Sequence, residues 1–301
     1  MCNYDPEYHA FGPWIIEISQ KHPLPPLFVP YYKETDDYLM LVKIPRNIDR
    51  RDAKPGMNLY DYVIGMYEDF IYILERKDNI VEETKLAYGE IEGIHILNDL
   101  LLGELTLYLT NRVIKIRYNT VSQDLITKLI KIIRDRYTNN IYRKVKNAYE
   151  LNELKKTDVL FSNLLNEMEK NDDTFNMIIV QPTTKLKSKN DNILQKIFRI
   201  ITGEKLLNCL HLINEKELVV VTRGKLIKKR KDVIYSYSLT YIPLEKLHDV
   251  VRSNDAHYNN LKKLHFKTYN HAFMFYYEEG NKQIEEIYRD FISMTRTSNI
   301  K

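Results

Sequence analysis

The sequence predicts an α+β fold in which two blocks of antiparallel strands are each closed by an amphipathic helix. Apolar and polar residues alternate through several short runs, which is the pattern of half-buried strands. In two places these runs end in a segment whose apolar residues are three and four positions apart, as in a helix packed on a core. The two blocks, residues 59–137 and 217–295, follow the same order.

The composition is typical of a soluble globular protein and not of a low-complexity or fibrous one. Of the 301 residues, 44% are hydrophobic and 29% are charged, and the 23 tyrosines favour strands with half-buried faces. The formal net charge is only +4, so nucleic acid is not an expected partner of the whole chain.

Three features favour a cytoplasmic location. The two cysteines, Cys2 and Cys209, are too few for a disulfide framework and suit a reducing compartment. No run approaches the roughly 18 consecutive apolar residues of a membrane-spanning helix. The first residues carry acids and aromatic side chains, whereas a signal peptide has a basic start and a long apolar segment. We therefore expect neither export nor a membrane span.

Residues 1–58 are predicted to form a proline-rich arm. Six of the ten prolines fall between Pro6 and Pro30. Because proline lacks a backbone donor and fixes φ, the arm is not expected inside a sheet. Two apolar runs within it, residues 14–18 and 38–44, are expected to pair or dock, with Trp14 as the anchor. The favoured role is to wrap the first domain and cover a sheet edge, and the alternative is to bind a partner.

Residues 59–137 are predicted to form the first domain. Two apolar runs flank Glu68 and Asp69, which indicates a β-hairpin. Residues 83–97 alternate as one long strand, and Asn111 is a turn residue between two further strands. The domain is expected to end in the amphipathic helix.

Helical patterns dominate the middle of the chain. Ser122 is placed to cap a helix whose apolar stripe runs to Tyr137. Residues 138–170 lack glycine and proline and are predicted to form a helical linker. A short strand is expected at residues 175–182 and a helix at 193–201.

Residues 171–301 are predicted to form the second domain. Arg223 and Gly224 are assigned to a turn, and a closing amphipathic helix begins near Ile284. The strands are expected at residues 206–214, 217–224, 225–231, 235–247, 261–268 and 271–280.

The two domains can be matched as an internal repeat. Asn111 matches Asn270, each in a turn between the last two strands, and Tyr88 matches Tyr241 in the long strand. One insertion near residues 253–259 accounts for the difference in length. Two alternating strands always share a period of two, so the shared order of hairpin, long strand, hairpin and helix is the stronger sign of a repeat.

The repeat resembles a known superfold. The ending LKKLHFKTYNHAFMFYYEEGNKQIEEIYRDFI, residues 261–292, is a strand, an Asn turn, a strand and a helix. It resembles the pleckstrin-homology-like (PH-like) superfold in the version found in small bacterial domains, and the resemblance covers about two thirds of the chain. It implies two tandem copies, each a bent antiparallel sheet or partly open barrel that a C-terminal amphipathic helix closes.

The sequence carries no catalytic motif. A glycine-rich phosphate loop, a paired-cysteine metal pattern, a histidine pair at helical spacing and a GxSxG elbow are all missing, so no catalytic residue, metal or cofactor is expected. Cys209 lies in an apolar strand, which favours a buried thiol. His211 shares its strand face, so an active Cys209/His211 pair is the alternative.

Basic residues gather in the second domain at a predicted turn and the strand after it. The cluster consists of Arg223, Lys225, Lys228, Lys229, Arg230 and Lys231. The PH-like resemblance implies a phosphate or acidic-lipid site here, and the alternative is a solvated edge that prevents aggregation. The matching turn of the first domain is acidic, so only the second domain is expected to bind such a ligand.

A second basic zone precedes the second block. It consists of Lys185, Lys187, Lys189, Lys196 and Arg199. If the fold brings it beside the first cluster, the combined patch is expected to hold phosphates at low salt. Sequence spacing does not decide whether it does.

Three functions follow from these patterns. The leading hypothesis is a non-enzymatic interaction module that binds a protein or peptide through a sheet edge or the groove beside the closing helix, with self-association left open. The second is binding of anionic lipid headgroups, at a membrane surface, or of another polyanion through the basic hairpin. The third is a hydrolase or transferase that uses Cys209 and His211.

Overall fold

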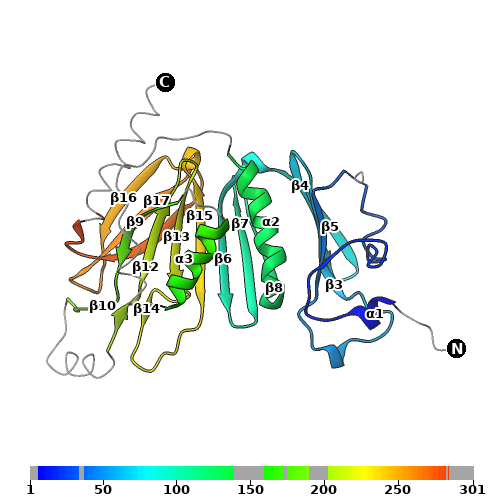
Figure 1. Ribbon diagram of the computed structural model, residues 1–301, viewed down its shortest axis with the longest axis horizontal. Helices are drawn as coiled ribbons and strands as arrows, with labels where there is room; N and C mark the ends of the chain where they lie inside the picture. Colours follow the sequence, from blue (N-terminus) through cyan, green and yellow to red (C-terminus); the bar gives the residue numbers. More distant parts are fainter. Residues whose placement is uncertain are drawn as a thin grey trace. The chain divides into compact units, whose positions relative to one another are not determined.

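The structure is sheet-rich and consists of two compact units. The computed structural model describes residues 6–33, 37–138, 159–171, 175–189, 203–282 and 284. Unit 1 comprises Met1–Ile91, Leu100–Leu105 and Lys115–Asn139, and unit 2 comprises Glu92–Asp99, Thr106–Ile114 and Asn140–Lys301. Antiparallel sheets dominate both, and helices are few among the described residues, which confirms the predicted α+β class (Figure 1).

Unit 1 contains a five-stranded sheet. Its strands follow one another in chain order, each antiparallel to the next. They are β1 (Ile16–Glu17), β2 (Met40–Pro45), β3 (Tyr60–Met66), β4 (Phe70–Lys77) and β5 (Ile80–Ala87). The hairpin predicted around Glu68 and Asp69 is confirmed, because it joins β3 to β4.

The proline-rich segment adds strands of its own to this sheet. β1 pairs with β2, and β2 pairs with β3 from Met40 to Pro45. The two apolar runs expected to pair or dock, residues 14–18 and 38–44, contain these strands, so their pairing is confirmed. The expectation that the arm stays out of a sheet interior is wrong for β2, which lies between β1 and β3. The positions of the prolines explain why the sheet tolerates them. Pro45 is the last residue of β2, where the register shifts, and Pro23 and Pro30 lie in the connection from β1 to β2.

Phenylalanines, and not the tryptophan, anchor this segment. Trp14 is 54% exposed, so its predicted role as the anchor is wrong. Its ring lies over Gly12, where any side chain would collide with it. Phe11 and Phe28 are buried in the core of unit 1 instead. A phenyl ring has no N–H group to satisfy, so it can be buried completely more easily than an indole.

A buried lysine clamps the same segment onto the sheet. Lys43, on β2, is 2% exposed. Its Nζ donates to the Pro23 carbonyl oxygen at 2.8 Å, forms an ion pair with Glu7 at 3.2 Å and lies 4.5 Å from the centre of the Tyr60 ring. Burial lowers the pKa of Lys43, and the charge of Glu7 partly opposes this. One cation thus joins two parts of the N-terminal segment to β2.

The helix predicted after Ser122 is present as α2 (Gln123–Arg136). Its buried residues belong to the predicted stripe and are Ile126, Leu129, Ile130 and Ile133. The expected side-chain cap is wrong, because the Ser122 hydroxyl accepts a hydrogen bond from the backbone N–H of Ile15 at 2.8 Å instead. Within the described residues, no helix is long and apolar enough to cross a membrane.

A short 3-10 helix breaks the long strand predicted at residues 83–97. β5 ends at Ala87, the 3-10 helix η2 (Tyr88–Glu90) follows, and then β6 (Ile91–Asp99) begins. The Glu90 carboxylate accepts a hydrogen bond from the backbone N–H of Ala87 at 2.8 Å and so stabilises the break. β7 (Leu102–Leu109) and β8 (Val113–Asn119) follow, with Asn111 in their connection as predicted. β6, β7 and β8 contribute residues to both units.

The turn between β6 and β7 is strained. Leu100 has a φ of 52°, in the left-handed region that costs a non-glycine residue about 1 kcal/mol or more. Asparagine tolerates this conformation better. Leu100→Asn should therefore raise the free energy of unfolding in urea by about 0.5 to 1 kcal/mol. Leu101, which is 60% exposed and has no positive φ, is the control, and an equal gain from Leu101→Asn would contradict the explanation.

Unit 2 has two sheet layers. One belongs to a seven-stranded sheet in the order β8, β7, β6, β15, β13, β12, β9. Its later strands are β9 (Asn176–Gln181), β12 (Cys209–Ile213), β13 (Glu217–Arg223) and β15 (Tyr237–Pro243). The other layer consists of β16 (Asp249–Asn254), β17 (Leu261–Lys267) and β18 (Ala272–Glu278). Apolar side chains such as Val220 and Phe266 fill the space between the layers.

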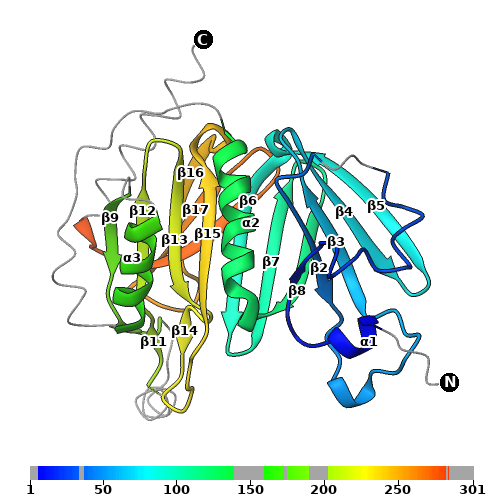
Figure 2. The same ribbon diagram turned by 45° about the vertical axis from the view of Figure 1, so that its right-hand side comes forward.

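A helix covers the other face of the seven-stranded sheet. α3 (Val159–Asn171) lies along β12 and β13 in both views (Figures 1 and 2). Phe161 on this helix is fully buried, and the Arg223 guanidinium at the end of β13 lies 5.3 Å from the centre of its ring. The short strand predicted at residues 175–182 is confirmed as β9.

Strand β6, from the first half of the chain, pairs with β15, from the second half. Thr240 lies opposite His95, and Tyr237 lies opposite Asn98. His95 Nδ1 and Thr240 Oγ1 are hydrogen-bonded at 2.9 Å, and Asn98 Nδ2 donates to the Tyr237 hydroxyl at 2.8 Å. We call this pairing the seam.

A buried carboxylate holds one end of the seam. Glu92, on β6, is 2% exposed and accepts hydrogen bonds from the turn between β17 and β18. The donors are Thr268 Oγ1 at 2.7 Å, the backbone N–H of Asn270 at 3.0 Å and Asn270 Nδ2 at 2.6 Å. Burial disfavours the charge, but these hydrogen bonds and the nearby His271 outweigh it, so the pKa of Glu92 lies below its ordinary value.

The strand predicted at residues 225–231 is wrong for most of its length. β13 pairs directly with β15, and only β14 (Ile227–Lys228) of that run is a strand. Basic residues occupy most of the run, so it lacks the alternating apolar face that a longer strand would bury. β14 instead joins β10 (Thr184–Lys185) and β11 (Lys205–Leu206) in a small sheet in the order β10, β11, β14.

Some predicted elements lie outside the described residues. They are the helix at residues 193–201, the linker between residues 139 and 158, and the closing helix beyond Ile284. The long strand predicted at residues 235–247 is broken like its counterpart, since the 3-10 helix η5 (Leu244–Lys246) separates β15 from β16.

The same element order occurs twice when the short strands β10, β11 and β14 of the second half are left aside. In the first repeat, β2, β3, β4 and β5 form consecutive strands, η2 follows, and β6, β7 and β8 come next. In the second, β9, β12, β13 and β15 are followed by η5 and by β16, β17 and β18. Because η2 and η5 occupy the same place, Tyr88 matches Leu244, and the predicted match with Tyr241 is wrong. Asn111 and Asn270 both lie in the turn before the last strand, as predicted.

Candidate functional site, a row of lysines

Three lysines stand side by side on the small sheet. The register places Lys185 opposite Lys205, and Lys205 opposite Lys228. Directly opposite residues on antiparallel strands project from the same face, with Cβ atoms about 5 Å apart. The three side chains therefore share one face, and we call them the lysine row. Like charges placed opposite each other on neighbouring strands destabilise a sheet.

In the part of the chain that the structure describes, none of the three lysines of the row forms an ion pair. Lys185 is exposed, and Lys205 and Lys228 are half-buried. Leu206, the next residue of β11, points to the opposite face and is 1% exposed. This buried leucine fixes which face of the small sheet carries the lysines.

The predicted basic cluster supplies one member of the row and a charged loop beside it. Lys228 belongs to the row. The Lys225 Nζ lies 3.9 Å from the Asp232 carboxylate, which also accepts a hydrogen bond from the backbone N–H of Lys229 at 3.1 Å. The exposed members of the loop are Lys225, Lys229, Arg230 and Lys231.

The structure also changes the membership of the predicted site. Arg223 is directed onto the Phe161 ring of α3 and so takes part in packing. Lys205 was not predicted, because a strand of two residues has no periodicity to reveal it. The signal that could identify it is its pairing with Lys228, which depends on the tertiary fold.

The second basic zone meets the first cluster at this sheet. Lys185 comes from that zone, and through Lys205 it is joined to the first cluster. The Lys189 ammonium donates to a backbone carbonyl oxygen, that of Asp255, at 2.7 Å. Lys196 and Arg199 lie outside the described residues.

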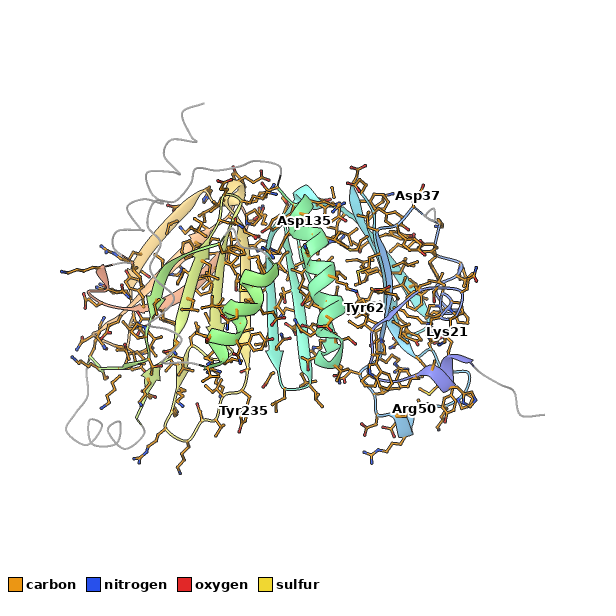
Figure 3. The ribbon with its side chains drawn as sticks, viewed as in Figure 1. Lys21, Asp37, Arg50, Tyr62, Asp135 and Tyr235 are labelled. Carbon is orange, nitrogen blue, oxygen red and sulfur yellow. The ribbon has the colours of Figure 1, made fainter. Side chains whose placement is uncertain are left out.

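Apolar side chains are exposed in the same loop. Val233 is 72% exposed and Tyr235, labelled in Figure 3, is 65% exposed. Both follow directly after the basic run that ends at Lys231. Basic groups attract anionic headgroups, and aromatic side chains are favoured at the level of those headgroups in a membrane.

Cys209 and His211 lie together between the two layers of unit 2. Cys209 Sγ is 3.4 Å from His211 Nε2, and both residues are 2% exposed. The imidazole ring packs against Phe266 and Phe275, with ring centres 5.8 and 5.7 Å away. Burial raises the pKa of the Cys209 thiol and lowers the pKa of His211 to about 3, so both groups are neutral near pH 7. Because a nucleophile needs the thiolate, this geometry favours the buried-thiol interpretation.

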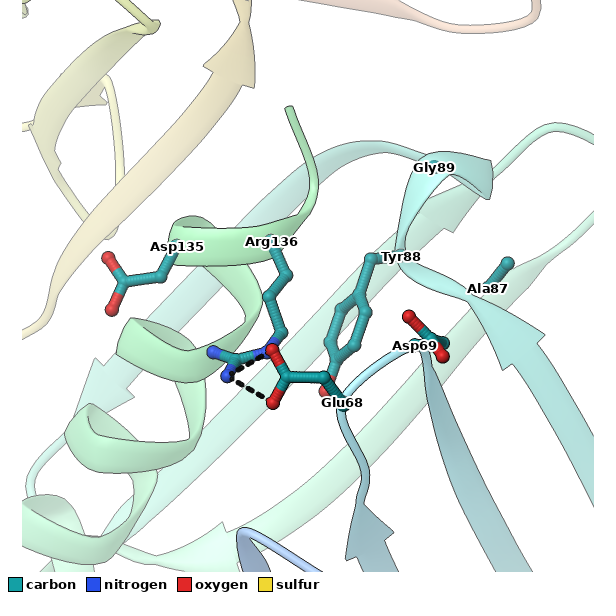
Figure 4. Close-up of a pocket in the computed structure, with 7 residues that line it drawn as sticks. All are labelled: Glu68, Asp69, Ala87, Tyr88, Gly89, Asp135 and Arg136. Carbon is teal, nitrogen blue, oxygen red and sulfur yellow. Dashed lines mark hydrogen bonds and ion pairs between the residues drawn. The ribbon is translucent and has the colours of Figure 1, made fainter. Parts of the chain in front are cut away.

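Unit 1 contains a pocket with acidic walls (Figure 4). It has a volume of about 460 Å³ and is lined by Glu68, Asp69, Ala87, Tyr88, Gly89, Asp135 and Arg136. Arg136 Nη2 donates to both carboxylate oxygens of Glu68, at 3.2 and 3.0 Å. Burial, with the charges of Glu68 and Asp69, raises the pKa of Tyr88 to about 12 against the opposing charge of Arg136. The surplus of carboxylates favours cationic groups over anionic ones.

Across the described ranges, no group of three or more His, Cys, Asp or Glu side chains could hold a metal ion. A comparison with models of protein families gives no match, and a comparison with curated proteins gives none either. The fold and the lysine row are therefore the basis for a functional proposal.

Proposed function

We propose that this chain is a non-enzymatic, cytoplasmic binding protein made of two tandem PH-like modules. The support is the repeated order of four strands, a 3-10 helix and three strands, with α2 following the first set. Open antiparallel sheets with an amphipathic helix after the last strand are features of that superfold. The small number of cysteines supports the cytoplasmic assignment.

The second module, in this proposal, binds an anion that carries several phosphate groups, such as an anionic lipid headgroup. The observation that carries the proposal is the lysine row. Three opposed ammonium groups repel one another in the free protein, and a multivalent anion placed over them would turn this repulsion into attraction. Binding should therefore weaken as salt rises.

The neighbouring loop suits a ligand that lies in a membrane. Its exposed basic residues extend the charge of the lysine row, and Val233 and Tyr235 offer apolar contact with the lipid interface. A soluble phosphate ester would use the lysine row alone, whereas a membrane would use both. Comparing inositol hexakisphosphate with vesicles of the same total phosphate separates these two sources of the ligand.

Cosedimentation with vesicles tests the proposal. Wild-type chain should bind phosphatidylcholine vesicles that contain phosphatidylserine or a phosphoinositide, and not phosphatidylcholine alone. Lys205→Glu with Lys228→Glu should weaken binding by roughly tenfold or more, because each basic residue near an anionic surface contributes about 1 kcal/mol. Raising the salt to about 0.5 M should release the wild-type chain.

A matched control has the same charge change on another surface. Lys128→Glu with Lys131→Glu reverses two exposed charges on α2, and should weaken binding much less. Equal losses from the two double variants would show that only net charge matters, and the lysine row would then be no site. Binding of wild type to neutral vesicles, unaffected by salt, would also refute the proposal.

A second candidate function is binding of a protein or peptide by addition of a strand. The seam favours it, because there an edge of one repeat already binds a strand from elsewhere in the chain. Complexes purified from the source cell with wild type and with Arg252→Glu, on the edge strand β16, test this candidate. A partner that both proteins retain equally would argue against binding at this edge.

A further inference from the structure

The seam shows how one edge of this protein recognises another. β6 and β15 pair over five residue pairs, from Ile94 with Tyr241 to Asn98 with Tyr237. In its own repeat, β6 is the first of three consecutive strands and β15 is the last of four. The seam is therefore a contact between two different edges, one from each repeat.

The chain contains a second pair of these edges. β5 is the counterpart of β15, because each directly precedes a 3-10 helix, and β16 is the counterpart of β6, because each follows one. β5 ends the five-stranded sheet and β16 ends the sheet of β16, β17 and β18. Within the described residues, each of the two has a strand neighbour on one side only.

We propose that β16 of one molecule pairs with β5 of a second molecule in the register of the seam. This proposal rests on the strand-addition candidate and names its partner as a second copy of this chain. The two edges differ, so the contact is heterologous, and every added molecule still presents one β5 and one β16. The assembly is therefore head-to-tail, and it forms a closed ring if the rotation between molecules brings the last β16 to the first β5 and an open chain if it does not.

The charges on the two edges fit this register. When η2 is aligned with η5, Glu83 of β5 corresponds to Leu239 of β15, and Arg252 of β16 corresponds to Ile96 of β6. Leu239 and Ile96 lie opposite each other in the seam. Glu83 and Arg252 therefore face each other across the proposed contact, and both are exposed in the single molecule. Opposite charges on facing positions of antiparallel strands favour the pairing. A slip by one residue would lose this match.

The proposed contact is weaker than the seam. His248 takes the position of Glu92, two residues after the 3-10 helix. It cannot reproduce the three hydrogen bonds that the Glu92 carboxylate accepts. Association between molecules should therefore depend on protein concentration, whereas the seam is present in every molecule.

Sedimentation velocity of the full chain over a concentration series tests the proposal. The wild-type sedimentation coefficient should rise with concentration. Arg252→Glu places two carboxylates opposite each other, and Glu83→Arg places two guanidinium groups opposite each other, so each variant alone should remain monomeric. An equimolar mixture restores opposite charges at each contact between unlike molecules, and it should associate as the wild type does.

The mixture separates a lost contact from a damaged fold, since one misfolded variant would not be rescued by another. This matters for Glu83, which also accepts a hydrogen bond from the Tyr72 hydroxyl at 2.6 Å. Amide hydrogen exchange is a second readout, and the amides of β5 and β16 should gain protection as wild type becomes more concentrated.

Three results would overturn the proposal. They are a monomeric wild type at every concentration, a mixture that does not associate, and an association that neither charge reversal changes. If wild type stays monomeric while Arg252→Glu loses a cellular partner, strand addition at β16 stands and the second copy is the wrong partner. The failure of this proposal is thereby distinguishable from the failure of the candidate function on which it rests.

Discussion

Replacement of Glu92 by glutamine should lower the free energy of unfolding by about 3 kcal/mol, because hydrogen bonds to a buried charged acceptor contribute about 1.5 to 3 kcal/mol each and are not additive. The amide keeps one oxygen and replaces the other with an NH2 group, which would then face the donor of either Thr268 or Asn270. Urea denaturation followed by circular dichroism measures the change.

The matched control is the same substitution at the surface. Glu104, on β7, forms ion pairs with Lys115 at 3.3 Å and Arg117 at 3.5 Å, and these two side chains are 62% and 80% exposed. Exposed pairs contribute about 0 to 1 kcal/mol, so Glu104→Gln should have a small effect. If the two substitutions lower stability equally, the seam is not held by Glu92.

The contribution of Glu92 should also depend on pH in a defined direction. Its pKa is lowered in the folded protein, so its contribution is fully present above the ordinary glutamate pKa of about 4.3. It is lost as the pH falls through the lower pKa of the folded state. The difference in stability between wild type and Glu92→Gln should therefore shrink in acid, and a difference that grows there would contradict the assignment.

Replacement of Lys43 by methionine should release the N-terminal segment. The substitution keeps the apolar stem and removes the charge that binds Glu7 and the Pro23 carbonyl oxygen. Breaking a buried ion pair by removing one partner lowers the free energy of unfolding by about 3 to 5 kcal/mol. Because the Glu7 side chain is 15% exposed, the loss for Lys43→Met should lie near or below the lower end of this range. Limited proteolysis should show faster cleavage between β1 and β2.

A double-mutant cycle identifies the pair as the cause. Adding Glu7→Gln to Lys43→Met removes the carboxylate that the first substitution leaves without its lysine, so the double variant should be less destabilised than the sum of the single ones. Additive effects would indicate that Lys43 acts through packing on Tyr60 and not through its charge.

The sequence predicts the strands and helix whose burial is periodic. β3, β4 and β13 carry continuous or alternating apolar residues, and α2 carries its stripe at helical spacing, so both periods are visible without the structure. The 3-10 helix η2 was missed because Leu86, Tyr88 and Ile91 are all buried, and the only sign of the break is the spacing of three between Tyr88 and Ile91. The arm strands were predicted only as two runs that pair or dock, because the prolines dominate the composition around them.

The candidate site could be predicted only in part. Lys228 was identified from local charge density, which a single stretch of sequence shows. The lysine row depends on three strands of two residues each, and the pairing of such short strands is set by the tertiary fold. For the same reason the sequence suggested Arg223 as a ligand, although its guanidinium packs over Phe161.

The seam has a consequence for the order in which the chain folds during synthesis. His95 and Thr240 are 145 residues apart in sequence, so β6 leaves the ribosome long before the strand that completes it. At about 5 to 20 residues per second, the nascent chain carries an open, partly apolar edge for roughly 7 to 30 s. Other nascent chains, or a chaperone, can bind that edge in the interval, and folding yield should therefore fall when translation stalls between β8 and β15.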